Sequence, residues 1–155
     1  MSRKLFLLFS AVFFMGIIVF NTNAQTSRKA VSGAEVTGTF RSYFTGKFKG
    51  SYNEIKILAL GKGKLKVGFE LSYPYITPRG EMSANVGATS GEAEIAGDTA
   101  VFSDSEFGEC KITIKFVKAG LIKVSQESDG SGCGFGFNVA ADGNYKKVSG
   151  AKPTF

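Results

Sequence analysis

The stretch that decides the fold reads KLKVGFELSY and spans residues 64–73. Its apolar residues alternate with polar or small ones, and they are Leu65, Val67, Phe69, Leu71 and Tyr73. Successive side chains of a β-strand point to opposite faces, so this pattern predicts a strand with one face against a core and the other in water. The same period of two recurs at 110–117 and at 133–139. The chain therefore predicts half-exposed antiparallel strands.

Short glycine-containing segments at 61–63, 96–98, 118–120 and 142–144 punctuate these runs. The strands that they separate are expected at 55–60, 64–73, 92–95, 99–103, 110–117, 121–126 and 145–148. Runs joined by such short turns predict successive hairpins. About eight to ten short strands in up-and-down order must close or stack, because an open sheet would leave a long unpaired edge. We predict an all-β fold, a small antiparallel meander barrel of the calycin type, with a β-sandwich as the alternative.

The first 24 residues have the layout of a secretory signal peptide. Arg3 and Lys4 precede an uncharged apolar run at 5–20, and small residues stand at Thr22 and Ala24 before the expected cleavage point. The apolar run is shorter than the roughly 20 residues that span a bilayer, which disfavours the alternative of an uncleaved anchor. We therefore expect a secreted or periplasmic protein without a stable membrane anchor.

The rest of the chain fits one domain. We expect a signal peptide at 1–24, a flexible leader at 25–34 and a single β-barrel domain at 35–150. The signal peptide holds two of the 19 basic residues and none of the 13 acidic ones, so its cleavage lowers the formal net charge from +6 to about +4. The chain has 20 glycines but only three prolines, and this balance indicates turns and bulges.

Cys110 and Cys133 are the only cysteines. Two cysteines in an exported chain predict a disulfide. In the chain-entropy description, closing a loop of this length contributes about 3 kcal/mol to stability. Because the sequence has no histidine, two isolated cysteines do not predict a metal site.

Charge is unevenly distributed. Residues 80–110 include seven acidic side chains and no basic one, whereas basic residues dominate 25–79. Such segregation favours steering of a charged partner, although a solvated surface is the simpler interpretation. The candidates for a partner-binding acidic face are Glu92, Glu94, Asp104, Glu106 and Glu109.

No catalytic pattern stands out. The absence of histidine excludes a Ser-His-Asp triad and removes the commonest general base. Glu92 and Glu94 share a face of their predicted strand, but that face is the wet one. The segments 129–132 and 142–144 place aspartate beside glycine, which is typical of turns and falls short of a calcium loop. We expect a protein that is not an enzyme and that holds no metal or cofactor.

Basic and aromatic residues interleave between positions 41 and 52. They are Arg41, Tyr43, Phe44, Lys47, Phe48, Lys49 and Tyr52. This mixture suits single-stranded nucleic acid, but export argues against a nucleic-acid partner. A glycan, an anionic lipid or a wall polymer would fit the same surface outside the cell.

The final third carries a resemblance. The segments CGFGFNV at 133–139 and DGNYKKV at 142–148, with the preceding runs at 91–93, 97–102 and 110–114, resemble small exported bacterial β-barrel proteins that mostly have no assigned function. The likeness covers roughly residues 50 to 150. It extends more distantly to periplasmic lysozyme inhibitors, disulfide-bearing barrels that insert a loop into an enzyme cleft. The S-G-x-x-Y motif of the family that binds c-type lysozymes does not occur, and Gly143-x-Tyr145 matches only a fragment of it.

The sequence leads to two functional hypotheses. The first is an exported, non-enzymatic binding module whose partner is a protein or small ligand, in its specific form a lysozyme inhibitor whose acidic region faces a basic enzyme. The second is a calycin-like carrier of a small apolar ligand. The inward residues expected to line its cavity are Phe69, Phe116, Phe135 and Phe137. The Gly-x-Trp signature of lipocalins is missing, because the chain has no tryptophan.

Overall fold

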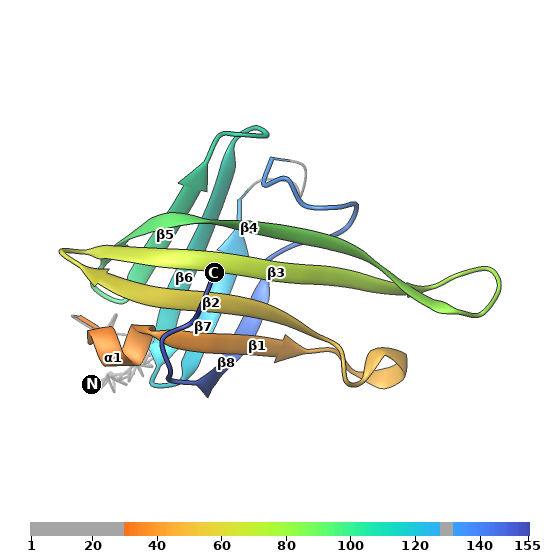
Figure 1. The fold of residues 1–155 in the computed structure, drawn as a ribbon, viewed down its shortest axis with the longest axis horizontal. Helices are drawn as coiled ribbons and strands as arrows, with labels where there is room; N and C mark the ends of the chain where they lie inside the picture. The colour runs from red at the N-terminus through yellow and green to blue at the C-terminus, as the bar shows by residue number, and fades with distance from the viewer. Residues whose placement is uncertain (1–29, 128–131) are drawn as a thin grey trace, which may run out of the picture.

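A computed structural model of the chain describes residues 30–127 and 132–155 (Figure 1). The expected signal peptide at 1–24 lies outside the described residues, as does the leader up to residue 29. The elements are α1 Gly33–Val36, β1 Gly38–Tyr43, η1 Gly46–Phe48, β2 Tyr52–Gly61, β3 Lys64–Ile76, β4 Met82–Ala96, β5 Thr99–Asp104, β6 Cys110–Lys118, β7 Leu121–Gln126 and β8 Gly143–Ser149.

The strands form a closed antiparallel barrel. Each strand pairs with the next in the chain, and β8 pairs with β1 to close the sheet. The predicted meander barrel is therefore confirmed, and the β-sandwich alternative is not found. In Figure 1, β1 to β4 run along the long axis while β5 to β8 cross them at a steep angle.

The interior is filled by the inward-facing residues of the alternating runs. On β3, Leu65, Val67 and Phe69 are each no more than 1% exposed. The largest fully buried side chains also include Phe40, Ile55, Ile57, Phe102, Ile112, Ile114, Phe116, Ile122 and Tyr145. An eight-stranded barrel is just wide enough for side chains to fill, and this sequence supplies bulky ones around its circumference.

Two expected strands differ from the structure. The run at 92–95 is the end of the 15-residue strand β4. The run at 133–139 is not a strand, because Gly134 and Asn138 adopt left-handed conformations with φ of +70° and +62° that interrupt an extended chain. The alternating apolar residues of this run therefore lie in a loop and do not form a strand.

β3 and β4 extend beyond the barrel. The pairing of β3 with β2 reaches only Glu70, and β4 pairs with β5 only from Ala93 onward. The two strands continue together to a turn at 77–81, so their distal part projects as a two-stranded ribbon (Figure 1). Tyr73 lies on this projection and is 43% exposed, which corrects the expectation that it faces the core.

The two ends of the described chain pack on the barrel. The Lys147 ammonium donates hydrogen bonds to the carbonyl oxygens of Ala34 and Glu35 at α1, at 2.9 and 3.0 Å. The C-terminal tail crosses the outer face of the barrel (Figure 1). The Phe155 ring lies over Gly68 of β3. A Cβ atom at position 68 would stand 3.0 Å from that ring, so glycine makes the contact possible.

Candidate functional site

The barrel interior is the first candidate site. Three of the four phenylalanines expected to line a cavity are buried in the core: Phe69, Phe116 and Phe135. The Phe69 ring centroid lies 5.4 Å from that of Phe102 and 6.5 Å from that of Phe135, in edge-to-face geometry. These rings contact one another where a ligand would otherwise sit.

Phe137 does not share this environment. Its side chain is 79% exposed, so the expectation that it faces inward is wrong. In a strand, positions 135 and 137 would face the same way, but the left-handed residues on either side of them break that rule.

The disulfide loop at 132–142 covers part of β4. Cys133 is bonded to Cys110 at the start of β6, as predicted. The Gly136 N–H donates to the Val86 carbonyl at 3.3 Å, and the Asn85 side-chain amide donates to the Phe137 carbonyl at 2.7 Å. The loop therefore bridges β4 and β6 where β4 and β5 have separated.

Phe135 fits because a glycine faces it. A Cβ atom at position 87 would lie 2.8 Å from the Phe135 ring, closer than packing allows. Gly87 thus lets the ring pass beside the β4 backbone into the core. The loop behaves as a plug anchored by one covalent bond.

The five acidic candidates fall into two sets. Glu92 and Glu94 lie on the outer face of β4, beside the lysines of β3. The Glu92 carboxylate accepts a hydrogen bond from Lys64 at 2.9 Å, and this bond raises the pKa of the Lys64 ammonium. This pair is exposed on both sides and contributes little to stability.

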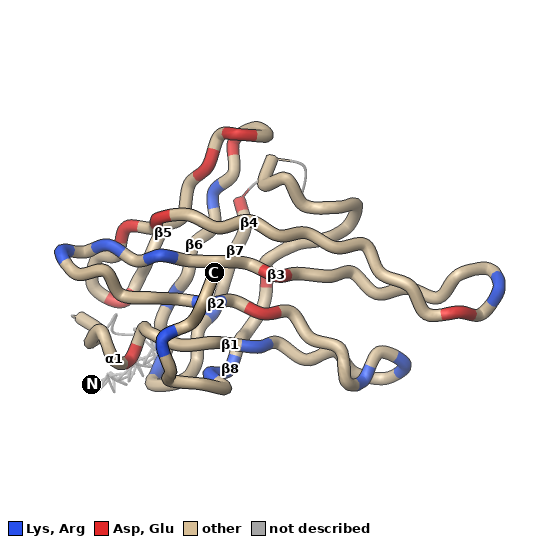
Figure 2. The backbone as a smooth tube through the Cα atoms, in the orientation of Figure 1, with Lys and Arg blue, Asp and Glu red and all other residues tan. Residues whose placement is uncertain are grey.

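The second set forms the acidic loop, which we define as residues 104–109. Asp104, Glu106 and Glu109 belong to it, and Figure 2 shows it as a separate acidic projection. The Asp104 carboxylate accepts the backbone N–H groups of Ser105 and Glu106 at 2.7 and 3.0 Å. Glu106 and Glu109 are exposed, and within the described ranges neither has an ion-pair partner.

Phe107 at the tip of the acidic loop was not singled out from the sequence. Its side chain is 65% exposed, yet its ring lies against Gly134 of the disulfide loop, where an added Cβ atom would stand 2.7 Å from the nearest ring carbon. Cys110 at the base of the same loop is bonded to the neighbouring Cys133. The acidic loop is therefore braced from two points and presents an aromatic ring between carboxylates.

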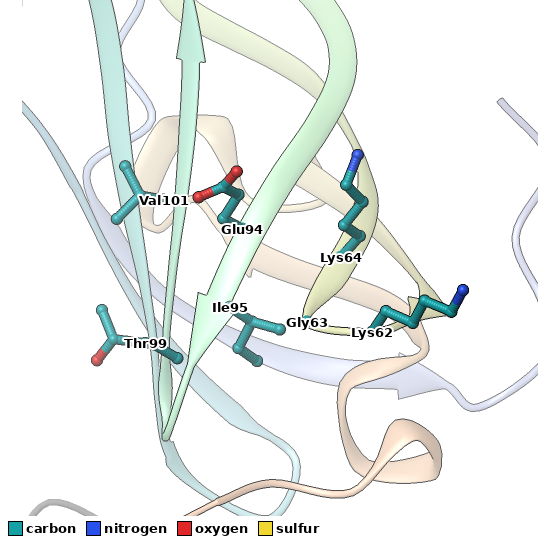
Figure 3. A pocket seen from close by; sticks show the side chains of 8 residues that line it. Lys62, Gly63, Lys64, Glu94, Ile95, Thr99 and Val101 are labelled. Atoms are coloured by element: carbon teal, nitrogen blue, oxygen red, sulfur yellow. The ribbon is translucent and has the colours of Figure 1, made fainter.

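A shallow pocket of about 550 Å³ lies where the β2–β3 and β4–β5 turns meet (Figure 3). Its charged side chains are Lys62, Lys64 and Glu94, and Ile95 and Val101 supply apolar wall. The volume is in the range of ligand sites, but the lining lacks a nucleophile paired with a base. It offers ionic contacts to a small polar molecule and no evident chemistry.

A charged ladder crosses the outer face of β1 to β3. Arg41 Nε lies 2.6 Å from a Glu54 carboxylate oxygen, and Lys56 lies within ion-pair distance of both Glu54 and Glu70. The Arg41 guanidinium also stacks 4.0 Å from the Tyr52 ring centroid. Because lysine and arginine bridge the opposed carboxylates, this geometry is that of a structural ion-pair network rather than a general acid and base.

Comparison of the chain with protein-family models, curated proteins and solved structures gave no match. Among the described residues there is no group of three or more potential metal-ligating side chains. No helix in the described ranges is long and apolar enough to cross a membrane. The described residues thus form a small disulfide-bonded antiparallel barrel.

Proposed function

We propose that the chain is an exported, non-enzymatic binding module that engages a basic protein through its acidic loop. The observation that carries this proposal is the combination of exposed carboxylates at Glu106 and Glu109 with the exposed ring of Phe107, which packs against the Gly134 backbone. Aromatic anchors on rigid supports dominate the binding energy of protein interfaces, and surrounding charges steer association.

The specific form of the proposal is inhibition of a lysozyme-like hydrolase. A projecting loop braced at its base loses little conformational entropy on entering a cleft, which favours affinity. The disulfide between Cys110 and Cys133 braces this loop at its base. The resemblance of the C-terminal third to small exported barrels supports a binding role outside the cytoplasm. Export of the protein is part of the proposal.

Inhibition constants against a panel of lysozymes test this function. Replacing Phe107 by alanine should weaken inhibition by about tenfold or more, because a central anchor is lost. The double change Glu106→Gln and Glu109→Gln should slow association and reduce its dependence on salt. Glu81→Gln removes an exposed carboxylate from a different hairpin and serves as the matched control.

Two results would contradict the proposal. One is the absence of inhibition across the panel, with no binding of the enzymes by calorimetry. The other is equal binding of lysozyme and of a basic protein that has no substrate cleft, since that would reduce the interaction to unspecific charge attraction.

The alternative function is transport of a small apolar molecule within the barrel. It requires the Phe69 ring to separate from the rings of Phe102 and Phe135, which both contact it, and so admit the ligand. Mass spectrometry of organic extracts from the purified protein tests it. A stoichiometric co-purified lipid would favour the carrier over the binding module.

A further inference from the structure

Two hairpins project from the same end of the barrel. One is the tip of β1 and β2 with η1, residues 43–52, and the other is the distal part of β3 and β4, residues 73–86 (Figure 1). We name these two segments together the twin-hairpin end. The acidic loop points in another direction, so the two surfaces are spatially separate (Figure 2).

Exposed apolar side chains concentrate at the twin-hairpin end. Of the twelve large hydrophobic side chains that are exposed among the described residues, seven lie here. They are Tyr43, Tyr52, Tyr73, Tyr75, Ile76, Met82 and Val86. Such a concentration on a soluble domain marks an interaction surface.

The apolar side chains occupy both faces of the projecting ribbon. Residues opposite each other in the register share a face, so Ile76 and Met82 lie on the same face as Val86, which is four register pairs further along. Tyr73 and Tyr75 alternate with those positions and therefore point to the other face. A rigid partner surface would cover one face only, whereas a fluid interface surrounds a projecting tip on all sides.

The charge of the twin-hairpin end is positive. Its basic residues are Lys47, Lys49 and Arg79, and Glu81 is its single acidic residue. Figure 2 shows the basic positions at both tips. A second copy of the chain docked tip to tip would bring like charges together, which argues against self-association here.

We propose that the twin-hairpin end docks on the headgroup region of an anionic phospholipid bilayer. Tyrosine is one of the two side chains that concentrate at membrane interfaces, because its ring is apolar and its hydroxyl is polar. Basic side chains add attraction to anionic headgroups, each contributing about fivefold to partitioning. Aromatic rings, aliphatic tips and a net positive charge are thus combined on one projecting end.

The backbone limits how deeply this end enters. Its terminal turn is satisfied internally, since the Thr77 and Gly80 N–H groups donate to the carbonyl oxygens of Glu81 and Thr77, both at 2.9 Å. The edges of the ribbon beyond Glu70 on β3 and before Ala93 on β4 have no neighbouring strand among the described residues. Unpaired strand edges are excluded from hydrocarbon, so the docking is confined to the hydrated interface.

A tryptophan reporter tests the proposal at a defined position. The chain has no tryptophan, so Tyr75→Trp introduces a single probe at the twin-hairpin end, and Phe107→Trp places the matched control on the acidic loop. Each protein is purified from the exported fraction, with its N-terminus defined by mass spectrometry. The vesicles contain phosphatidylcholine alone or phosphatidylcholine mixed with phosphatidylglycerol, and brominated acyl chains serve as quenchers.

We expect the Tyr75→Trp emission to shift to shorter wavelength and to be quenched in the mixed vesicles, while the Phe107→Trp emission stays unchanged. No shift of Tyr75→Trp in either vesicle would overturn the proposal, and it is the result expected if an acidic protein is the real partner. Equal shifts at the two positions would also overturn it, because they would show attachment by another part of the chain.

Charge variants provide the second arm. In the Tyr75→Trp background, replacing Lys47, Lys49 and Arg79 by glutamine should lower partitioning into mixed vesicles on the order of 100-fold. The control variant replaces three lysines of β6 and β7 by glutamine, namely Lys115, Lys118 and Lys123, so that it has the same net charge. Equal losses in the two triple variants would contradict a docking surface and would indicate unspecific attraction.

The contribution of the exposed apolar side chains to membrane partitioning is tested with a second pair of variants. Ile76→Ser with Met82→Ser should weaken partitioning by at least about tenfold, since two exposed apolar groups leave the interface. Leu60→Ser with Val148→Ser removes exposed apolar groups elsewhere on the barrel and should leave partitioning unchanged. A larger loss of partitioning in the Leu60→Ser, Val148→Ser variant than in the Ile76→Ser, Met82→Ser variant would overturn the assignment of the twin-hairpin end as the docking surface.

Discussion

β3 and β4 form one continuous hairpin with two contrasting parts. Within the barrel, Leu65, Val67 and Phe69 are almost fully buried, because the strands opposite supply side chains that pack against them. Beyond Leu71 the same alternation continues, yet Tyr73 and Tyr75 are 43% and 37% exposed. The comparison shows that period-two alternation predicts a strand and which side chains share a face. Whether that face is buried depends on which other strands or loops pack against it.

The largest expected effect is the loss of stability when a buried side chain of β3 is truncated. Phe69→Ala removes a ring that contacts Phe102 and Phe135, and we expect it to lower the free energy of unfolding by about 3–5 kcal/mol. Tyr75→Ala on the same strand should change it by no more than about 0.5 kcal/mol, because the exposed ring is not part of the core. Urea unfolding followed by circular dichroism measures both, and comparable losses would mean that the projecting ribbon is packed as tightly as the barrel.

The second effect concerns the loop that marks the boundary between the two parts. Cys110→Ala with Cys133→Ala removes the disulfide, and we expect a loss of about 3 kcal/mol because the unfolded chain is no longer constrained. Hydrogen exchange should accelerate at the Gly136 and Val139 amides, which are hydrogen-bonded within and beside the loop. Exchange in the ribbon beyond Ser72 should change little. Unaltered protection at Gly136 would show that the loop is held without its covalent anchor.

The smallest effect compares buried and exposed tyrosine. Tyr145 lies in the barrel, and burial raises the pKa of its hydroxyl, which donates to the Ala141 carbonyl at 2.9 Å. Because the folded state holds this proton more tightly than the unfolded state, the contribution is complete below about pH 10, the ordinary tyrosine pKa, and declines above it. The expected slope is about 1.4 kcal/mol per pH unit from this one group.

Tyr145→Phe should remove that part of the alkaline slope, at a cost of about 1 kcal/mol at neutral pH for the lost hydrogen bond. Unfolding free energies of the wild type and the variant between neutral and alkaline pH provide the measurement. Identical alkaline slopes would show that Tyr145 is not sequestered from solvent.

Much of the architecture followed from local pattern. Alternation located β3 and β6, and the glycine-containing turns located β2, β5, β7 and β8. The single pair of cysteines predicted the disulfide. These features depend on backbone periodicity and turn conformation, which a short stretch of sequence determines.

The candidate surfaces were only partly predictable. The acidic residues were recognised by composition, but their division into an outer-face set and a loop set depends on where β5 ends. Phe107 carried no signal, because a lone phenylalanine between glutamates gives no indication of the Gly134 backbone that supports it. The exposure of Tyr73 was hidden by the regular pattern that it shares with the buried part of β3.

The sequence by itself determined the class of this protein: antiparallel strands in meander order, joined by short turns and braced by one disulfide. Only the tertiary structure decided that the barrel closes from β8 to β1, that Phe135 enters the core while Phe137 leaves it, and that β3 and β4 outrun their neighbours. The physical reason is that alternation and turn chemistry act over a few residues, whereas closure, plugging and exposure depend on which distant segments meet.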